Sequence, residues 1–179
     1  MPARAFTVGH STHELDALAA LLRRHGVTAV ADVRRHPGSR RHPQFASHTL
    51  AASLPARGIA YAHLPQLGGR RRPEPGSAND GWEHESFRGY ADHLASDEFA
   101  KGLAKLEALA RERPTAVMCA EGLWWRCHRR LVADVLTVRG WTVCHIAPGG
   151  ALTEHALPDF ARVEGTHITY PAPQLRLGG

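Results

Sequence analysis

The stretch CAEGLWWRCHRR, residues 119–130, brings two thiols, a carboxylate, an imidazole and three arginines into one short segment. The thiolate is the reactive form of cysteine, and neighbouring cations or a helix N-terminus lower the pKa of a thiol. Cys127 stands beside Arg129 at the expected start of a helix, where unpaired N–H groups carry partial positive charge. We therefore predict that Cys127 has a lowered pKa and acts as a catalytic nucleophile, while Arg129 and His128 hold an anion.

Other interpretations of the same segment stay open. Cys119 and Cys127 would form a redox pair, or would bind a metal ion together with a histidine. Their C-x7-C spacing differs from the C-x2-C of structural zinc sites. Without any function, Cys119 would be a small buried hydrophobe and Cys127 would pack under the helix start. The cysteine-phosphatase signature is not met, because Arg129 follows Cys127 by only two residues.

Two acid–base candidates belong to neighbouring strand ends. His10 follows Gly9 after an apolar run and would serve as an acid, a base or a ligand. Ser11 would contact the substrate, or would cap the following helix together with Thr12. Glu121 stands at the end of another expected strand among tryptophans, where a carboxylate suits acid–base chemistry. We predict catalytic roles for His10 and Glu121.

Two arginine-rich loops would line an anion site. DVRRHPGSRRHPQF (32–45) holds Arg34 and Arg40 around a proline–glycine turn, which favours a shaped loop. LPQLGGRRR (64–72) holds Arg70 after two glycines. Guanidinium groups form paired hydrogen bonds with phosphate and carboxylate. The alternative for residues 32–45 is a solvated basic loop without a ligand.

Aromatic side chains lie near these arginines. FRGYADHL (87–94) contains Arg88 and Tyr90, and Trp125 belongs to the cysteine-containing segment. Aromatic rings interleaved with arginines suit stacked bases and phosphates, and they also suit a lid over a small-molecule pocket. The alternative is that the rings pack the loops against the protein body.

Short apolar runs alternate with helical patterns along the chain, which predicts right-handed crossovers between parallel strands. We expect an α/β fold: a single-domain three-layer sandwich with a mainly parallel sheet of about five strands and helices on both faces. Ligands bind at the carboxyl ends of such strands, so the candidate residues would surround one mouth. The expected strands span residues 5–9, 27–33, 59–65, 115–121 and 141–147.

The α/β domain is expected to cover residues 1–150. Residues 151–179 contain several prolines and show poor periodicity, so they are interpreted as a C-terminal extension. Within the domain, Asp97 is the expected N-cap of a long amphipathic helix that includes Phe99 and Leu103.

Composition narrows the class of protein. The net charge is +5, and all but two of the 22 basic residues are arginines, which favours a small anionic molecule or a nucleic acid as partner. No apolar run reaches the roughly 20 residues that span a membrane, and no signal peptide is recognised. Three cysteines do not make a disulfide framework, so a cytoplasmic location is expected.

Several motifs occur together in a recognisable order: TVGHST, ADVRRHPGSRRHPQF, YAHLPQLGGRR, FRGYADHL and VMCAEGLWWRCHRRLVADVL. From about Phe6 to Ile146 the chain resembles the domain-of-unknown-function 488 family. The family's central stretch is close to CAEALPWRCHR, and this sequence departs from it at Gly122 and Trp124. The resemblance implies a fold and a map of motifs, and it implies no established reaction.

These observations favour an enzyme that acts on an anionic, phosphate- or nucleotide-like substrate at the strand ends, through Cys127, Glu121 and His10. The alternatives are a non-catalytic nucleic-acid-binding module with an arginine and aromatic surface, and a metal or redox site at Cys119 and Cys127. Neither a cofactor nor an oligomeric state is predicted. The predicted substrate-binding residues are Ser11, Arg34, Arg40, Arg70, Arg88, Tyr90, Trp125, His128 and Arg129.

Overall fold

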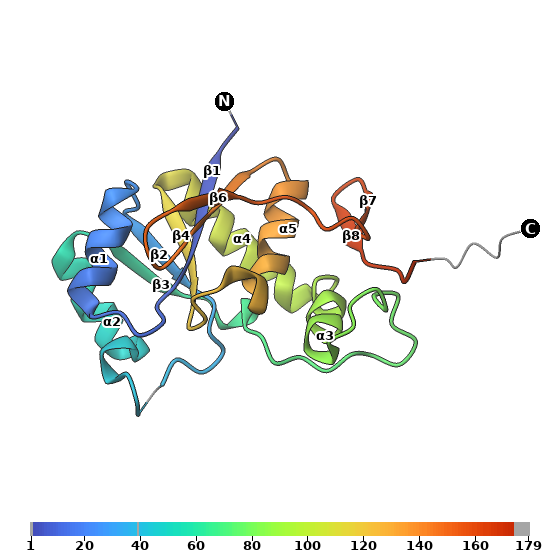
Figure 1. Ribbon diagram of the computed structural model, residues 1–179, viewed down its shortest axis with the longest axis horizontal. Helices are drawn as coiled ribbons and strands as arrows, with labels where there is room; N and C mark the ends of the chain where they lie inside the picture. The colour runs from blue at the N-terminus through green and yellow to red at the C-terminus, as the bar shows by residue number, and fades with distance from the viewer. Residues whose placement is uncertain (1, 39, 174–179) are drawn as a thin grey trace, which may run out of the picture.

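The computed structural model describes residues 2–38 and 40–173, and its centre is a six-stranded sheet in the order β3-β2-β4-β1-β5-β6 (Figure 1). The first five strands pair in parallel, and only β6 runs antiparallel to its neighbour. The predicted α/β fold with a mainly parallel sheet is therefore confirmed. The strands are β1 (Arg4–Gly9), β2 (Ala29–Asp32), β3 (Ala60–His63), β4 (Thr115–Cys119), β5 (Thr142–Ile146) and β6 (Leu152–Glu154).

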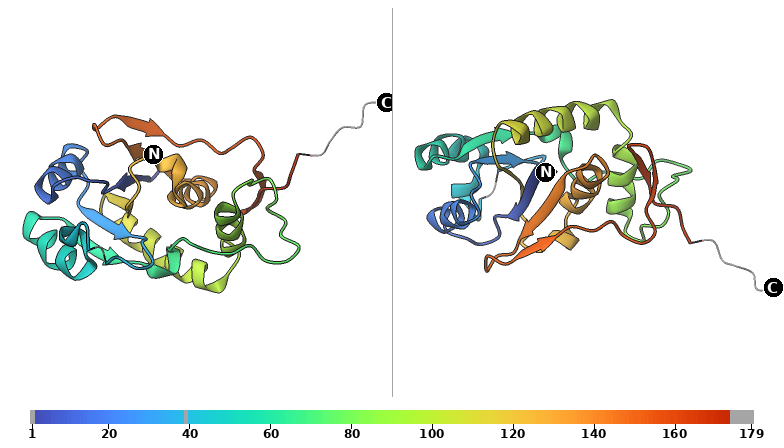
Figure 2. Two further views of the ribbon diagram at one scale, coloured as in Figure 1. Left: turned by 60° about the horizontal axis from the view of Figure 1, so that its bottom comes forward. Right: turned by 90° about the horizontal axis from the view of Figure 1, so that it is seen from above.

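Helices cover both faces of the sheet (Figures 1 and 2). The connections from β1 to β2 and from β2 to β3 carry α1 (Leu15–Arg24) and α2 (Ser47–Ser53). The later connections carry α3 (Glu85–His93), α4 (Asp97–Glu112) and α5 (Arg129–Val138). The chain reverses its direction of travel across the sheet after β3, so right-handed crossovers place the later helices on the opposite face.

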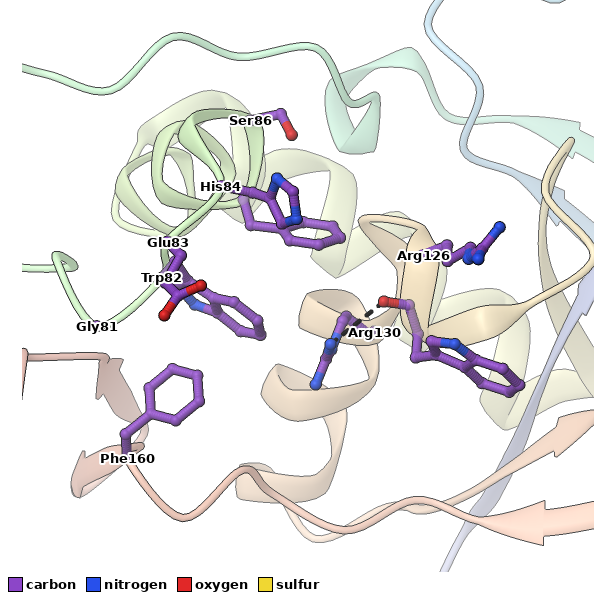
Figure 3. Close-up of a pocket in the computed structure, with 10 residues that line it drawn as sticks. Gly81, Trp82, Glu83, His84, Ser86, Arg126, Arg130 and Phe160 are labelled. Atoms are coloured by element: carbon purple, nitrogen blue, oxygen red, sulfur yellow. Dashed lines mark hydrogen bonds between the residues drawn. The ribbon is translucent and has the colours of Figure 1, made fainter.

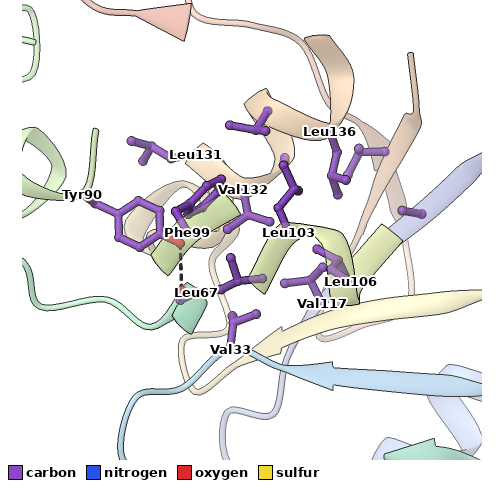
Figure 4. Close-up of a cluster of buried hydrophobic side chains, with 14 of the residues drawn as sticks. Val33, Leu67, Tyr90, Phe99, Leu103, Leu106, Val117, Leu131, Val132 and Leu136 are labelled. Carbon is purple, nitrogen blue, oxygen red and sulfur yellow. Dashed lines mark hydrogen bonds between the residues drawn. The ribbon is translucent and has the colours of Figure 1, made fainter. Parts of the chain in front are cut away.

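Two buried clusters fill the spaces between these layers because side chains of a strand alternate between its faces. Val30 of β2 joins the cluster under α1 and α2, whereas the next residue, Ala31, joins the cluster under α4 and α5. Val117 and Cys119 of β4 likewise belong to the cluster under α4 and α5, which Figure 4 shows around Leu106. The alternation decides which polar side chains can meet at the strand ends.

Helix starts differ in detail from the sequence prediction. Ser96, not Asp97, caps α4, because its hydroxyl accepts a hydrogen bond from the N–H of Phe99 at 3.1 Å. The predicted caps at Ser11 and Thr12 are also wrong: α1 begins after Glu14, and no side chain caps it. Ser11 instead adopts a left-handed backbone with φ 47° in the turn after β1.

The region after residue 150 contains short strands that the sequence pattern did not indicate. Besides β6, the strands β7 (Arg162–Glu164) and β8 (His167–Thr169) form a hairpin beside α5 and α3 (Figure 1). Tyr170, which follows β8, is fully buried. These strands have three residues each, which is too short for a clear alternating pattern.

The central strand β4 stands between β2 and β1, where the chain's path across the sheet diverges. The connections after β1 and β2 lead to one face, and the connection after β4 leads to the other. Such a point opens a crevice at the carboxyl ends of the strands, and it is the usual ligand-binding place in open α/β sheets. The cysteine-containing segment follows β4 and begins in this crevice.

Candidate active site

Two thiols meet at the carboxyl end of β4. Cys119 ends the strand, and Cys127 follows a single 3-10 turn, Trp124–Arg126, that brings the chain back over the strand end. The two Sγ atoms are 2.8 Å apart, and the Cys127 thiol donates its hydrogen bond to Cys119. Both side chains are buried. The two sulfurs therefore form one chemical unit.

Arg129, at the start of α5, lies against this pair and is completely buried. Its Nη1 donates to the Cys119 sulfur at 2.7 Å and to the backbone oxygen of Glu121, and its Nη2 donates to the oxygen of Gly122 at 3.1 Å. The guanidinium thus fixes the loop after β4 while it places a positive charge on the sulfur. No carboxylate among residues 2–38 and 40–173 forms a direct ion pair with it.

These contacts separate the acidities of the two cysteines. Burial raises the pKa of Cys119, but the hydrogen bond from Cys127 and the charge of Arg129 outweigh burial and lower that pKa to about 7. The hydrogen bond that Cys127 donates to Cys119, together with burial, raises the pKa of Cys127 well above its ordinary value. The predicted lowering of the Cys127 pKa is therefore wrong, because the cation contacts the other sulfur.

His128 lies on the outer side of the pair. Its Nε2 donates to the backbone oxygen of Val33 at 3.3 Å, so its unprotonated Nδ1 faces the Cys127 sulfur at 3.5 Å. Burial lowers the pKa of His128 to about 4, so the ring is neutral at pH 7. A neutral imidazole there can accept a hydrogen bond from a thiol, but it adds no positive charge.

A chain of buried hydrogen bonds extends behind Arg129. Its Nε donates to Thr7 Oγ1 at 3.2 Å, and Thr7 contacts His145 Nδ1 at 2.6 Å. His145 Nε2 meets His155 Nδ1 at 2.9 Å, and His155 Nε2 donates to Asp134 Oδ1 at 2.6 Å. The chain ends at the Asp134 carboxylate, which accepts the hydrogen bond from His155.

This chain is held from two further directions. Trp124 stacks on His145 with ring centroids 4.1 Å apart and an interplanar angle of 1°. The Tyr170 hydroxyl donates to the second oxygen of Asp134 at 2.7 Å. Burial lowers the pKa of His145 to about 3, and this keeps the ring neutral. Residues from β1, α5, β5 and the segment around β6 to β8 thus support one guanidinium.

A second arginine cluster occupies the opposite face of the sheet. Arg34 turns back over the end of β2, and its Nε and Nη2 donate to the two oxygens of the buried Asp32 carboxylate at 2.9 and 2.7 Å. The Tyr61 hydroxyl donates to the same carboxylate at 2.6 Å. Arg34 also donates to His10 Nε2 at 3.2 Å. His10 is buried against Phe45 with ring centroids 4.2 Å apart.

Burial lowers the pKa of His10 to about 4, so this ring is neutral at pH 7. Its Nδ1 donates to the oxygen of Ser11 at 3.0 Å. His10 does not line the cavity beside the thiols, but it contacts two residues that do: its ring contacts Arg34, and its backbone N–H donates to the oxygen of Cys119 at 2.9 Å. The turn before His10 requires Gly9, since a Cβ there would come within 1.9 Å of the Glu121 carbonyl oxygen.

A cavity of about 610 Å³ opens in front of the thiol pair. It receives residues from the loops after β2, β3 and β4, as the strand-end rule predicts. Of the predicted site residues, Arg34, Arg70, Glu121, Cys127 and His128 line it. Its other lining residues are Arg35, His36, Gly38, Gly69, Ser86, Phe87, Cys119, Ala120 and Arg126; of these, Cys119 was expected at a site only in the metal or redox alternative.

The remaining predicted residues lie elsewhere. The Tyr90 side chain is fully buried and donates to the oxygen of Leu67 at 2.7 Å (Figure 4), and Arg88 donates to the oxygen of Trp82. Arg40 is exposed and does not line the cavity. Trp125, 47% exposed, lines a neighbouring hollow instead. Glu121 is exposed, and its carboxylate accepts a hydrogen bond from the N–H of Leu123.

Sequence reasoning missed the members of the buried chain, Thr7, Asp134, His145 and His155. Thr7 and His145 stand within apolar strands, and a polar residue at a buried position needs a partner. That signal was present, but it could not identify which partners meet across the fold.

No group of three or more His, Cys, Asp or Glu side chains is placed to hold a metal ion within the part of the chain that the structure describes. Among the same residues, none of the helices combines the length and the apolar character needed to cross a membrane.

Comparison with known proteins gives one match. No curated protein and no solved structure matched the chain. The model of the family described as domain of unknown function DUF488 matches residues 14–136, which is more than half of the chain. The match contains β2, α4, β4 and most of α5, including both thiols and Arg129. The chain belongs to the DUF488 family, as its motifs predicted.

Proposed function

We propose that the protein is a thiol enzyme that acts on an anionic, phosphate- or nucleotide-like substrate in the cavity before β4. The single observation that carries this proposal is the 2.7 Å contact between Arg129 Nη1 and the Cys119 sulfur. A buried arginine whose guanidinium contacts a sulfur directly stabilises the thiolate form of that cysteine at neutral pH. Cys119 is therefore the reacting group, and Cys127 supports it as hydrogen-bond donor.

The cavity wall supports an anionic substrate. Arg34, Arg35, Arg70 and Arg126 line it from three loops. Within the described residues, only Arg34 of these four has a carboxylate partner. The other three guanidinium groups are therefore available to bind phosphate or carboxylate oxygens.

The two remaining candidates, Glu121 and His10, take different roles. Glu121 lines the cavity with an exposed carboxylate, so it is the side chain that exchanges protons with a bound substrate. His10 lies behind Arg34 and contacts its Nη1, so it acts by positioning Arg34.

A second candidate function is dithiol–disulfide exchange, and the 2.8 Å separation of the sulfurs favours it. The Cys119 thiolate attacks a substrate disulfide, forming a mixed disulfide and releasing one substrate thiolate. Cys127 then loses its proton, attacks the Cys119 sulfur and releases the second thiolate. Two electrons pass from the protein to the substrate, and the protein ends with a Cys119–Cys127 disulfide.

Alkylation followed by peptide mass spectrometry tests the reactive sulfur. At pH 7 we expect iodoacetamide to label Cys119 first, with a rate that rises to half its maximum near pH 7. Cys119→Ser should abolish turnover of any active compound in a panel of nucleotides, phosphate monoesters and glutathione disulfide. Cys144→Ser is the matched control, because Cys144 is buried in the cluster on the other face of the sheet.

Two outcomes contradict the primary proposal: labelling of Cys127 before Cys119, or undiminished turnover in Cys119→Ser. Reduction of glutathione disulfide with loss of both free thiols would instead select the second candidate. Cys127→Ala separates the two, since it stops dithiol exchange at the mixed disulfide but only slows chemistry that needs one thiolate.

A further inference from the structure

A second hollow, of about 750 Å³, adjoins the cavity before the thiols (Figure 3). Aromatic rings supply most of its bulky side chains: Trp82, Phe87, Trp125 and Phe160 line it together with Arg130. These residues come from the loop before α3, from α3 itself, from the turn after β4, from α5 and from the segment before β7. None of them belongs to the thiol pair or to the buried chain behind Arg129.

The rings are held at fixed mutual orientations. The Trp82 ring lies 5.3 Å from Phe87 and 4.9 Å from Phe160, measured between centroids. Arg130 lies over the face of Trp82 at 4.7 Å, and its Nη1 donates to the Trp125 backbone oxygen at 3.2 Å (Figure 3). Planar surfaces that are already ordered accept a flat ligand at little entropic cost.

Trp125 is the exposed member of this set. It is 47% exposed, while Trp82 is 6% exposed. An exposed tryptophan at the rim of an aromatic hollow offers exposed ring surface for stacking. Arg130 already places a positive charge inside the hollow, which disfavours a cationic ligand there. A neutral planar ring with polar edges fits this environment, since His84, Ser86 and Glu83 supply hydrogen-bonding groups around it.

The two hollows adjoin each other. Ser86, Phe87 and Arg126 line both of them. A ligand with a flat ring in the aromatic hollow therefore extends past Arg126 toward Cys119 and the arginines of the first cavity. Glu83 and Glu121 are the acidic residues on the two walls, and the arginines outnumber them.

We propose that the aromatic hollow is a nucleobase subsite, so that the ligand of the two adjoining hollows is a nucleotide with its phosphate directed toward Cys119. This inference rests on the proposed function, because it identifies the substrate class of the same site. Base–aromatic stacking supplies affinity without strong sequence preference, and arginine supplies the phosphate contact. A free nucleotide and the end of a single-stranded nucleic acid share this chemistry.

Titration calorimetry on the full chain tests the subsite with defined probes: adenosine, adenosine 5′-monophosphate, inorganic phosphate and a single-stranded oligonucleotide. We expect the monophosphate to bind more tightly than either adenosine or phosphate alone. Trp125→Ala should weaken monophosphate binding on the order of tenfold, as expected for the loss of one stacking face. Trp125→Phe should restore most of the affinity. Leu152→Ala, at another exposed apolar side chain on β6, is the matched control.

Arg126→Gln should weaken the monophosphate but leave adenosine unchanged, because it removes a phosphate contact and keeps the rings. Tighter binding of the oligonucleotide than of the monophosphate identifies nucleic acid as the source of the base, and the reverse order identifies a free nucleotide. Equal affinities of the unaltered protein and Trp125→Ala, or equal affinities for inorganic phosphate and the monophosphate, overturn the subsite. Alkylation of Cys119 is measured in parallel, so failure of the subsite with a reactive Cys119 leaves the thiol proposal standing.

Discussion

Arg34 and Arg129 lie at the ends of neighbouring strands, but they serve opposite electrostatic purposes. Arg34 forms a two-pronged ion pair with Asp32 on the face that α1 and α2 cover. Arg129, on the face that α4 and α5 cover, donates to a sulfur and to backbone oxygens. It reaches a carboxylate, Asp134, only through three intervening side chains.

The different partners of Arg34 and Arg129 determine which of the two guanidinium groups can act on a neighbouring side chain. A carboxylate in direct contact neutralises a guanidinium, so Arg34 mainly shapes the loop after β2. A distant carboxylate orients the guanidinium of Arg129 through hydrogen bonds and leaves most of its field on Cys119. Proximity of an arginine to a strand end therefore does not identify its role; the first partner of the guanidinium does.

Arg129→Met should have the largest effect. It leaves the acceptors of the β4 loop and Thr7 without their buried donor, so we expect a loss of about 4 kcal/mol in the free energy of unfolding. The Cys119 pKa should rise, and alkylation at pH 7 should slow on the order of tenfold. Urea denaturation and the pH profile of alkylation measure the two effects. Arg129→Lys is the control that keeps the positive charge but lacks the two-pronged guanidinium. If Arg129→Met left the pH profile of alkylation unchanged, the proposal that Arg129, unlike Arg34, acts on Cys119 would be wrong.

Arg34→Met should cost about 3 kcal/mol of stability, because it strands the buried Asp32 carboxylate with Tyr61 as its remaining side-chain donor. In contrast to the first variant, the alkylation profile of Cys119 should stay the same. The double variant Asp32→Asn with Arg34→Met should recover part of the lost stability in urea denaturation. Slower alkylation of Cys119 in Arg34→Met would contradict this expectation and show that the groups around Arg34 and Arg129 are coupled across the sheet.

Acidification should have a graded effect on both clusters. Burial depresses the pKa of His10, beside Arg34, to about 4, and that of His145, behind Arg129, to about 3. In the unfolded chain both histidines have the ordinary pKa of about 6.5, so they take up protons at a higher pH than in the folded protein. The free energy of unfolding is therefore at its full value above pH 6.5. It decreases as the pH falls toward 4, by up to about 1.4 kcal/mol per pH unit for each histidine.

Thermal unfolding at a series of pH values measures this slope. His10→Gln and His145→Gln should each flatten it, and the effect of each on Cys119 alkylation sharpens the comparison. We expect His145→Gln to slow alkylation, because His145 belongs to the chain behind Arg129, and His10→Gln to leave it unchanged. If neither variant altered the pH dependence of thermal stability, His10 and His145 would not be the histidines responsible for it.

The general architecture was predictable because it depends on local patterns. Apolar runs and helical periodicity located the five parallel strands, and the strand-end rule brought Arg34, Arg70 and Cys127 to one cavity. The short strands after residue 150 were not predictable, since three residues give too little pattern.

The chemistry within the site was less predictable because it depends on distances across the fold. Nothing in the order of residues showed that Arg129 would turn toward Cys119 and away from the adjacent Cys127. Tyr90 was expected at a ligand, but helical packing directs its ring into the core and its hydroxyl to Leu67. Proximity in sequence thus pointed to the segment that holds both thiols, but it predicted the lowered pKa for Cys127, whereas Cys119 has it.

The tie between Tyr170 and Asp134 has a consequence for biosynthesis. Cys119 and Arg129 are translated well before His155 and Tyr170, which complete the buried hydrogen-bond chain. Until those last residues leave the ribosome, Asp134 has neither of these donors and α5 cannot adopt its final surroundings. The buried hydrogen-bond chain behind Arg129 is therefore complete only after residue 170 has been translated, so this part of the fold forms later than the strands and the helix that it connects.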